Sequence, residues 1–303
     1  MRKIVIAGGS GYLGSLLTKH FTNCADQVTI LTRGKDHVCE NVHFVNWDGK
    51  TADAWVSALE NTHVLINLNG RSVDCRYTEE NKKLIYSTRL ESTEILGRAI
   101  QQCAKPPRIW INAGSATIYR HSLDKEMDEF TGEIGSGFSV DVCKSWEAMF
   151  DSLPAPHTRK VIIRTGIVIG REGGPLRPLT MLARLGAGGR QGRGDQYFSW
   201  LHEADFVNSV EFLINKADAS GAFNLTAPAP ISNSHFMKVL RKAMGIPFGI
   251  PLPVWLLELG AVIINTETEL ILKSRRVIPK RLLDAGYTFS YSTIEKALAD
   301  LCE

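Results

Sequence analysis

The stretch KIVIAGGSGYLGSLL, residues 3–17, decides the fold. It begins with the short β-branched run Lys3–Ala7, which predicts a buried strand, and Gly11–Phe21 then carries leucines at helical spacing. The turn between the strand and the helix has the pattern G-x-x-G-x-x-G and contains Gly8, Gly11 and Gly14. In a dinucleotide-binding unit such glycines allow a tight turn, close approach of a pyrophosphate and close packing of the helix. The order of strand, glycine turn and helix therefore predicts a nucleotide site here.

Segments of strand length alternate with helix-period segments through the first two thirds of the chain. Further strands are predicted at Gln27–Leu31, Val42–Val45, His63–Leu68, Arg108–Asn112 and Val161–Ile163. Long helices are predicted over Thr78–Cys103, with Thr78 as the N-cap, and over Ser139–Phe150. This alternation predicts an α/β protein with a Rossmann-type, doubly wound parallel sheet.

The regular alternation of strand-length and helix-period segments ends after residue 172, which predicts a smaller, mostly helical C-terminal lobe. We expect a nucleotide-binding domain at 1–172, to which the chain returns around 198–226, and a substrate lobe at 173–303. Within the lobe, Ser234 is expected to cap a helix. The apolar stretch Val254–Ile264 is much shorter than the ~20 residues of a membrane span, so we expect a buried or interface helix.

Composition excludes several classes of protein. Lys plus Arg number 35 and Asp plus Glu number 32, which gives a formal net charge of +3 in 303 residues. This charge is too small to predict binding to nucleic acid or to an anionic membrane. The six cysteines form no CxxC pair and no cluster with zinc spacing, so no metal site is predicted. Reduced thiols, and a first strand that leaves no room for a signal peptide, lead us to expect a cytoplasmic protein.

The end of the second strand bears on the choice of cofactor. An NAD site requires an acidic residue there to bind the ribose hydroxyls. This chain reads ILTRGK, with Thr32 and Arg33 in that position and no carboxylate. A guanidinium matches a 2′-phosphate bidentately, so the sequence favours NADP over NAD. The alternative is that Arg33 is an ordinary solvated surface residue.

Several further motifs give the chain a family resemblance that extends over nearly its whole length. They are LTRG at Leu31–Gly34, INLNGRSV at Ile66–Val73, STRLEST at Ser87–Thr93, GSATIY at Gly114–Tyr119, CKSWE at Cys143–Glu147, RTGIVIG at Arg164–Gly170, FSWLHEAD at Phe198–Asp205, FNLTAPAP at Phe223–Pro230 and SRRVIPKRLLDAGYTF at Ser274–Phe289. With these motifs the chain resembles the extended short-chain dehydrogenase/reductases. More narrowly, it is similar to an atypical, sugar-nucleotide epimerase-like group of the NAD(P)-dependent epimerase/dehydratase family, which has its own C-terminal extension.

The resemblance implies a set of NADP contacts. They fall on Gly8, Ser10, Gly11, Tyr12, Leu13, Gly14, Thr32, Arg33, Asn69, Gly70 and Arg89. Asn69 and Gly70 would pass under a ribose of the cofactor. For Arg89 an ion pair with Glu91 or Glu94 on the surface of the helix is an equal alternative.

The resemblance also implies a catalytic Ser, Tyr and Lys, and here the chain departs from the pattern. Ser115 and Lys144 match the Ser and the Lys, but the Tyr, four residues before the Lys, falls on Val140. A valine exchanges no proton, so the Y-x-x-x-K motif is broken. Tyr119 is the nearest alternative donor, although a packed aromatic residue is the simpler interpretation of it. Ser115 and Lys144 also have plain structural interpretations, as a strand-end hydroxyl and a solvated lysine.

Two functions follow from these motifs. The first is an NADP(H)-dependent epimerase or oxidoreductase on an unknown, sugar-nucleotide-like substrate, with Tyr119, Lys144 or the substrate itself handling the proton. The second is a non-catalytic protein that senses NADP(H). The resemblance further predicts a homodimer joined through Thr78–Cys103 and Ser139–Phe150. His202 is expected to be structural.

Overall fold

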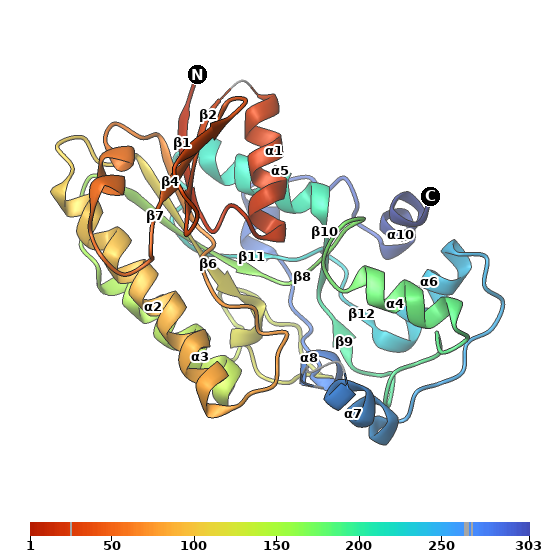
Figure 1. The fold of residues 1–303 in the computed structure, drawn as a ribbon. Coiled ribbons are helices and arrows are strands. Elements are labelled where there is room, and N and C mark those ends of the chain that lie inside the picture. Colours follow the sequence, from red (N-terminus) through yellow and green to blue (C-terminus); the bar gives the residue numbers. More distant parts are fainter. Residues whose placement is uncertain (25, 264–266, 268) are drawn as a thin grey trace.

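A twisted sheet of eight strands forms the centre of the computed structural model, which describes residues 1–24, 26–263, 267 and 269–303 (Figure 1). From one edge to the other the strands are β11 (Gly221–Leu225), β7 (Arg159–Thr165), β6 (Ile109–Ser115), β5 (Val64–Asn67), β1 (Lys3–Ala7), β2 (Gln27–Thr32), β4 (Val42–Asn46) and β3 (His37–Cys39). All neighbours are parallel except β3 and β4. The predicted doubly wound α/β fold is confirmed.

The central strand β1 shows why the sequence forms this sheet. Ile4 pairs with Val28 of β2 on one side and with Val64 of β5 on the other. Ile4, Val5 and Ile6 are each at most 1% exposed. A strand that is covered on both faces needs apolar side chains in its buried positions, and Ile4–Ala7 supply them.

Helices cover both faces of the sheet (Figure 1). On one face, α1 (Tyr12–Asn23) and α5 (Glu203–Asn215) pack against β1 and its neighbours. On the other face lie α2 (Glu79–Gln102) and α3 (Phe138–Ser152) with the short η1 (Ala54–Leu59). The side chain of Thr78 accepts a hydrogen bond from the amide of Asn81, which confirms the predicted N-cap of α2.

The smaller C-terminal lobe is mostly helical. Its elements are α4 (Leu176–Arg184), α6 (Asn233–Ala243), α7 (Val254–Ile263), α8 (Glu269–Leu272) and α10 (Ile294–Cys302), with two small sheets that pair β8 (Ile167–Ile169) with β10 (Trp200–His202) and β9 (Tyr197–Phe198) with β12 (Ile231–Ser232). Trp200, Phe236 and Leu298 belong to a hydrophobic core of this lobe. α9 (Lys280–Asp284) instead lies against β11 of the main sheet, so the chain crosses back before it ends.

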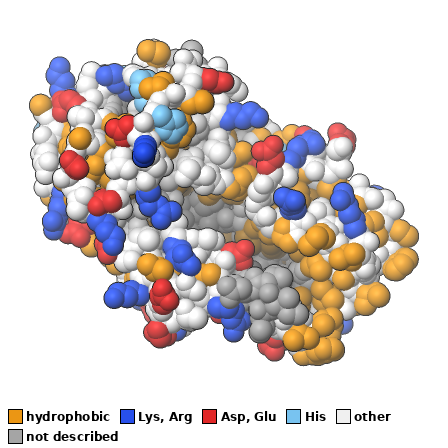
Figure 2. Space-filling view, viewed as in Figure 1, with side chains coloured by type: hydrophobic (Ala, Val, Ile, Leu, Met, Phe, Trp, Pro, Cys, Tyr) orange, Lys and Arg blue, Asp and Glu red, His pale blue; other side chains and the backbone are white. Residues whose placement is uncertain are grey.

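Two expectations for the lobe require correction. The side chain of Ser232 caps α6 by accepting a hydrogen bond from the amide of His235, whereas Ser234 lies inside the helix. The apolar stretch from Val254 was expected to form a buried or an interface helix, and the buried alternative is wrong, because Trp255 is 66% exposed. The interface alternative stays a prediction. Figure 2 shows hydrophobic side chains gathered on this part of the lobe. The last residue of that expectation, 264, lies outside the described residues.

In the part of the chain that the structure describes, no helix is both long enough and apolar enough to cross a bilayer.

Candidate nucleotide and substrate site

A cavity of about 410 Å³ opens at the carboxyl ends of β1, β5 and β6. The order of the strands reverses between β1 and β5, which is the place where doubly wound sheets bind ligands. The glycine turn before α1 forms one wall of the cavity. Further lining residues come from the region between β5 and α2, from α2 itself, from the end of β6 and from α3. They include Leu68, Tyr77, Arg89, Ser115, Ser139, Cys143 and Trp146.

The glycine turn has a backbone that only glycine fits. Gly8 has a φ of +81°, and a Cβ there would lie 2.9 Å from the backbone of Leu68 and Asn69. A Cβ on Gly14 would lie 2.5 Å from the carbonyl oxygen of Gly8. The helix therefore approaches β1 and β5 closely only because these side chains are absent.

The N-terminus of α1 presents a second feature that suits a phosphate. Its N-cap, Gly11, offers no side-chain hydrogen bond to the first turn. Tyr12, Leu13 and Gly14 of that turn line the cavity together with Gly8 and Gly11. The first amides of a helix have no partner within it and carry the positive end of the helix dipole, so they bind anions. The turn thus fits the pyrophosphate of a dinucleotide.

Arg33 lies just after β2, beyond the lining of the cavity. Its side chain is exposed, and it makes no ion pair with any residue that the structure describes. The hydroxyl of Thr32 accepts a hydrogen bond from the amide of Gly34, which shapes the turn that follows the strand. The carboxylate of the nearby Asp36 accepts a hydrogen bond from the amide of Asn46. An exposed guanidinium is therefore available at the end of β2, while one oxygen of the Asp36 carboxylate is bonded to the backbone.

Arg89 lies inside the cavity, next to the residues that follow β5. Its guanidinium carbon is 5.2 Å from the centre of the Trp146 ring, and a Cβ on Gly70 would lie 3.1 Å from the same carbon. Asn69 is held by a hydrogen bond from its side-chain amide to the carbonyl of Thr88, at 3.2 Å. Burial lowers the pKa of Arg89.

The surface ion pair that was an alternative for Arg89 is not formed. Glu91 lies 3.3 Å from Lys50, and Glu94 lies 2.5 Å from Arg98. Arg89 instead donates a hydrogen bond to the carbonyl of Ile85, at 3.0 Å. A buried guanidinium without a carboxylate partner among the described residues attracts an anionic or oxygen-rich ligand.

Of the three expected catalytic residues, only Ser115 lines the cavity. It lies at the end of β6, and its hydroxyl accepts a hydrogen bond from the amide of Thr117 at 3.1 Å, which caps the short helix η2 (Ala116–Ile118). A hydroxyl has capacity for a further hydrogen bond. Ser115 is therefore able to contact a ligand in the cavity.

The structure places Lys144 and Val140 away from the cavity. The ammonium of Lys144 lies 3.7 Å from the carboxylate of Asp141, and its side chain is 54% exposed. Val140 is 1% exposed and does not line the cavity. The residues of α3 that face the cavity in the corresponding i, i+4 positions are Ser139 and Cys143, one residue earlier in each case.

Tyr119 is a packed residue below the cavity. It is 1% exposed, its hydroxyl donates to the side-chain oxygen of Asn224 at 3.0 Å, and it accepts from Arg164 at 2.9 Å. Arg164 is in turn paired with Glu147 at 2.7 Å. Burial raises the pKa of Tyr119, although the nearby guanidinium opposes this. The hydrogen bonds account for Tyr119 without a catalytic role.

The sequence did not identify three further side chains in the cavity. The hydroxyls of Tyr77 and Ser139 lie 3.4 Å apart, and Cys143 is on the same helix face as Ser139. Burial raises the pKa of Tyr77 and raises that of Cys143 to about 12, so both side chains hold their protons at neutral pH. The helical spacing of positions 139, 142, 143 and 146 in the sequence could have indicated that Ser139 and Cys143 share one face of α3.

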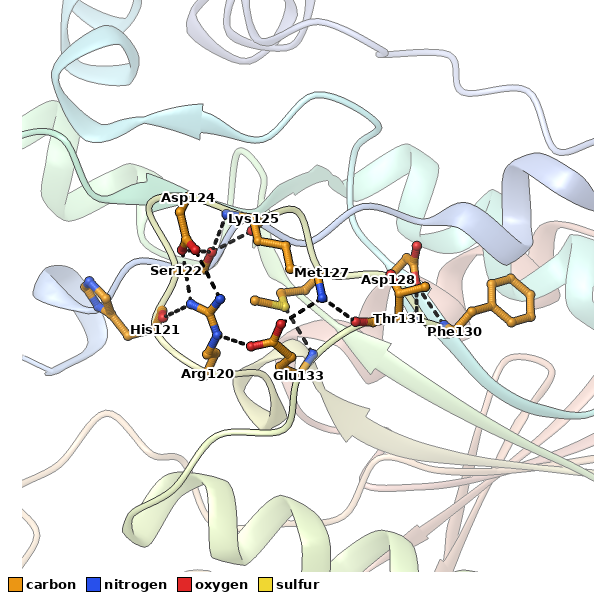
Figure 3. A network of polar contacts seen from close by, with 10 residues as sticks. All are labelled: Arg120, His121, Ser122, Asp124, Lys125, Met127, Asp128, Phe130, Thr131 and Glu133. Atoms are coloured by element: carbon orange, nitrogen blue, oxygen red, sulfur yellow. Dashed lines mark hydrogen bonds and ion pairs between the residues drawn. The ribbon is translucent and has the colours of Figure 1, made fainter.

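The segment after Tyr119 connects the site to the C-terminal part of the chain. Figure 3 shows its polar network, in which Arg120 contacts Asp124 and Glu133, and Lys125 also contacts Glu133. Backbone hydrogen bonds then tie it to the SRRV segment, from Ser122 to Ser274 at 3.0 Å and from Met127 to Arg276 at 2.7 Å. This network fixes the chain that follows α8 against the end of β6.

Comparison with protein families gave two matches. The model described as the NAD dependent epimerase/dehydratase family matches residues 4–226. A domain of unknown function, DUF1731, matches residues 252–301. Together the two matches span both lobes of the structure.

Similar proteins cover almost the whole chain. An epimerase family protein of Staphylococcus aureus (strain MRSA252) is 32% identical over 304 residues, which is 99% of each chain. The epimerase family protein SDR39U1 of Bos taurus is 31% identical over 305 residues, again with 99% of each chain covered.

Solved structures agree with these matches. The crystal structure of human epimerase family protein SDR39U1 (isoform 2) with NADPH has a TM-score of 0.88 and 28% identity, and the match covers 100% of this chain and 99% of that one. The nucleoside-diphosphate sugar epimerase from Corynebacterium glutamicum has a TM-score of 0.77 and 27% identity, and covers 99% of this chain and 57% of that one. UDP-N-acetylglucosamine 4-epimerase from Bacillus cereus, at 14% identity and a TM-score of 0.78, shares the fold.

Proposed function

We propose, from the premise that this chain belongs to the NAD-dependent epimerase/dehydratase family, that it binds NADP(H) in the cavity beside the glycine turn. The observation that carries the proposal is the turn itself, where Gly8 and Gly14 leave the first amides of α1 open to the cavity. The human relative crystallised with NADPH supports the same cofactor.

The family resemblance, together with the positions of the side chains, supports the following contacts with the cofactor. The turn, with Ser10, Tyr12 and Leu13, would hold the pyrophosphate. Thr32 and Arg33 would hold the adenosine ribose and its 2′-phosphate, because a guanidinium pairs with phosphate through two parallel hydrogen bonds. Asn69, Gly70 and Arg89 would lie along the other ribose.

We further propose that the reaction is oxidoreduction or epimerisation at a carbinol carbon of a sugar-nucleotide-like substrate. Bound NADP(H) supplies hydride-transfer chemistry. Ser115 would donate a hydrogen bond to the substrate oxygen. Tyr119 and Lys144 do not line the cavity in this arrangement. The proton would instead come from the neighbouring hydroxyls of Tyr77 and Ser139, because both residues line the cavity.

A second candidate, a protein that senses NADP(H) without turnover, is favoured by a different observation. Among the described residues, no Tyr–Lys pair lines the cavity: Lys144 is exposed, and Tyr119 is bonded to Asn224. A cofactor site without an acid–base pair binds but does not react efficiently.

One experiment separates these functions. The protein is purified without added ligand and any bound nucleotide is identified by mass spectrometry, after which the loaded protein is incubated with fractionated metabolites. Both functions predict bound NADP or NADPH, and only an enzyme changes its oxidation state when a fraction contains the substrate. A protein that carries no nucleotide and gives no heat on titration with NADPH would refute both.

We also propose that the chain acts in the cytoplasm as a homodimer joined through α2 and α3. All six cysteines are free thiols, which suits a reducing compartment. Two long helices on each partner would form a four-helix interface about a two-fold axis. Light scattering at micromolar concentration should give twice the mass of one chain.

A further inference from the structure

Three side chains with metal-binding atoms meet on the surface where α1 contacts α5. His20 and Cys24 are four residues apart at the end of α1 and therefore lie on one side of the helix. Glu211 reaches them from α5, which packs beside α1 (Figure 1). The imidazole nitrogen, the thiol sulfur and a carboxylate oxygen all lie within 4.8 Å of one another.

We propose that His20, Cys24 and Glu211 bind a single zinc ion, with water as the fourth ligand. Imidazole and thiolate are ligands that zinc prefers, and a carboxylate completes a set of three protein ligands with one open position. Ca²⁺ and Mg²⁺ prefer sites made of oxygen atoms, so this donor set disfavours them.

The distances suit a tetrahedral ion. The Nε2 atom of His20 lies 3.9 Å from the Sγ atom of Cys24, and Nε2 also contacts a carboxylate oxygen of Glu211 closely. Zinc bonds of about 2.0–2.3 Å place tetrahedral ligand atoms about 3.3–3.8 Å apart. The thiol already lies close to this separation, and the carboxylate would move outward as the ion replaces its direct contact with the imidazole.

The surroundings orient the carboxylate and balance the charge. Arg2 donates a hydrogen bond to one oxygen of Glu211 at 3.0 Å, and the other oxygen faces His20. The ion pair with Arg2 holds this side chain as an ionised carboxylate. Together with the thiolate of Cys24, it would neutralise a divalent ion. Partners such as Arg2 are what hold metal ligands in position.

The site is accessible, and it is separate from the cofactor cavity. The side chains of His20 and Glu211 are 25% and 26% exposed, and Cys24 is exposed. None of the three lines the cavity beside the glycine turn. Zinc would link the end of α1 to α5 and so stabilise α1, the helix that begins at the glycine turn. The proposal does not depend on the proposed function.

Cobalt spectroscopy and calorimetry on the reduced full chain test the proposal. Co²⁺ should bind once per chain and give the charge-transfer absorption of a cobalt–thiolate bond, and Zn²⁺ should displace it. Cys24→Ser should abolish this band and weaken zinc binding by more than about 100-fold, since losing even a supporting partner costs roughly 10–100-fold. The matched control is Cys39→Ser, another exposed cysteine, which should bind both metals like the natural protein.

A second measurement covers the case in which a substitution alters folding. Zinc should raise the Tm of the natural protein and of Cys39→Ser, but not that of Cys24→Ser or His20→Ala, because a ligand that binds only the folded state stabilises it. A cobalt spectrum without a thiolate band, or a zinc-dependent Tm that survives Cys24→Ser, would overturn the proposal. Either result would mean that His20 and Glu211 form an ion pair next to the thiol of Cys24 and that the three side chains do not make up a zinc site.

Discussion

At the scale of single residues, the proposed preference for NADPH over NADH would depend on Arg33. The guanidinium is exposed at the end of β2 and has no ion-pair partner among the described residues. We predict that Arg33→Ala weakens NADPH binding by about 1.5–3 kcal/mol, the value of a hydrogen bond to a charged group, and leaves NADH binding nearly unchanged. Calorimetric titration of both cofactors measures this. The control is Arg98→Ala, an exposed arginine paired with Glu94, and an equal loss in both variants would count against the role of Arg33.

Val140 gives a second residue-scale prediction. It is 1% exposed and packed away from the cavity, so Val140→Tyr would force a ring into a filled core. We predict a loss of roughly 1–3 kcal/mol in the free energy of unfolding, without a new proton donor in the site. Denaturant unfolding measures this loss. The exposed neighbour provides the control, since Lys144→Ala should stay within about 0.5 kcal/mol of the natural protein.

The same region shows why the sequence led to Ser115, which lines the cavity, but not to the residues of α3 that line it as well. Ser115 follows a strand whose end is easy to recognise, and strands of a parallel sheet bring their carboxyl ends together. On a helix, a shift of one residue rotates a side chain by about 100°. The family motif places the catalytic Tyr and Lys at positions 140 and 144. In the structure, the packing of α3 against the sheet instead directs Ser139 and Cys143 toward the cavity. Residue types alone do not fix that rotation.

At the scale of elements, the glycine turn before α1 would carry the proposed nucleotide site. A Cβ on Gly14 would lie 2.5 Å from the carbonyl oxygen of Gly8, a backbone atom that cannot move independently. We predict that Gly14→Ala displaces α1 and lowers NADPH affinity at least tenfold, with a loss of stability measurable by thermal unfolding. Gly260→Ala, in α7, meets no atom within 4 Å and should stabilise its helix by roughly 0.5–1 kcal/mol. Equal NADPH binding by the two variants would contradict a role for the close approach of Gly14 to the carbonyl oxygen of Gly8.

The N-cap of α5 predicts a dependence of stability on pH. His202 accepts a hydrogen bond from the amide of Ala204, and burial lowers the pKa of His202 by more than Asp300 raises it. The unfolded chain therefore binds a proton at this position before the folded chain does. Stability should be full above pH 6.5, the ordinary value, and should fall as the pH drops from there toward the lowered pKa.

Denaturant unfolding at several pH values between roughly 5 and 8 measures how stability depends on pH. His202→Gln can still cap the helix but does not titrate, so its stability should change less over that range. The exposed His235 provides the control, because His235→Gln should keep the slope of the natural protein. A His202→Gln protein with an unchanged slope would remove His202 as the cause.

Elements with a clear hydrophobic or capping pattern were predictable, and elements without one were not. The alternation of apolar runs located β1, β2, β4 and β5, and Thr78 marked the start of α2. The three-residue strand β3 contains His37, Val38 and Cys39, all exposed, so it carries no hydrophobic pattern. Ser232 and Ser234 are equally good caps by type, and only the backbone conformation selects Ser232.

At the scale of the whole molecule, the site depends on contacts between distant parts of the chain. β11 joins the sheet beside β7, and the SRRV segment is bonded to residues 122–127. Such pairings join segments up to about 150 residues apart, and no local pattern encodes them. The sequence therefore predicted a second lobe but not how its last part crosses back to the sheet.

NADP(H) binding is what the fold and the glycine turn are proposed to serve, and a titration with both cofactors is the sharpest test of it. Purified natural protein, freed of nucleotide, is titrated with NADPH and with NADH in the calorimeter at one salt concentration. We expect one site per chain for NADPH and at least tenfold weaker binding of NADH, because a phosphate–guanidinium contact is present only with the former. Equal affinities, or no heat with NADPH, would show that the proposed NADP(H) site is wrong.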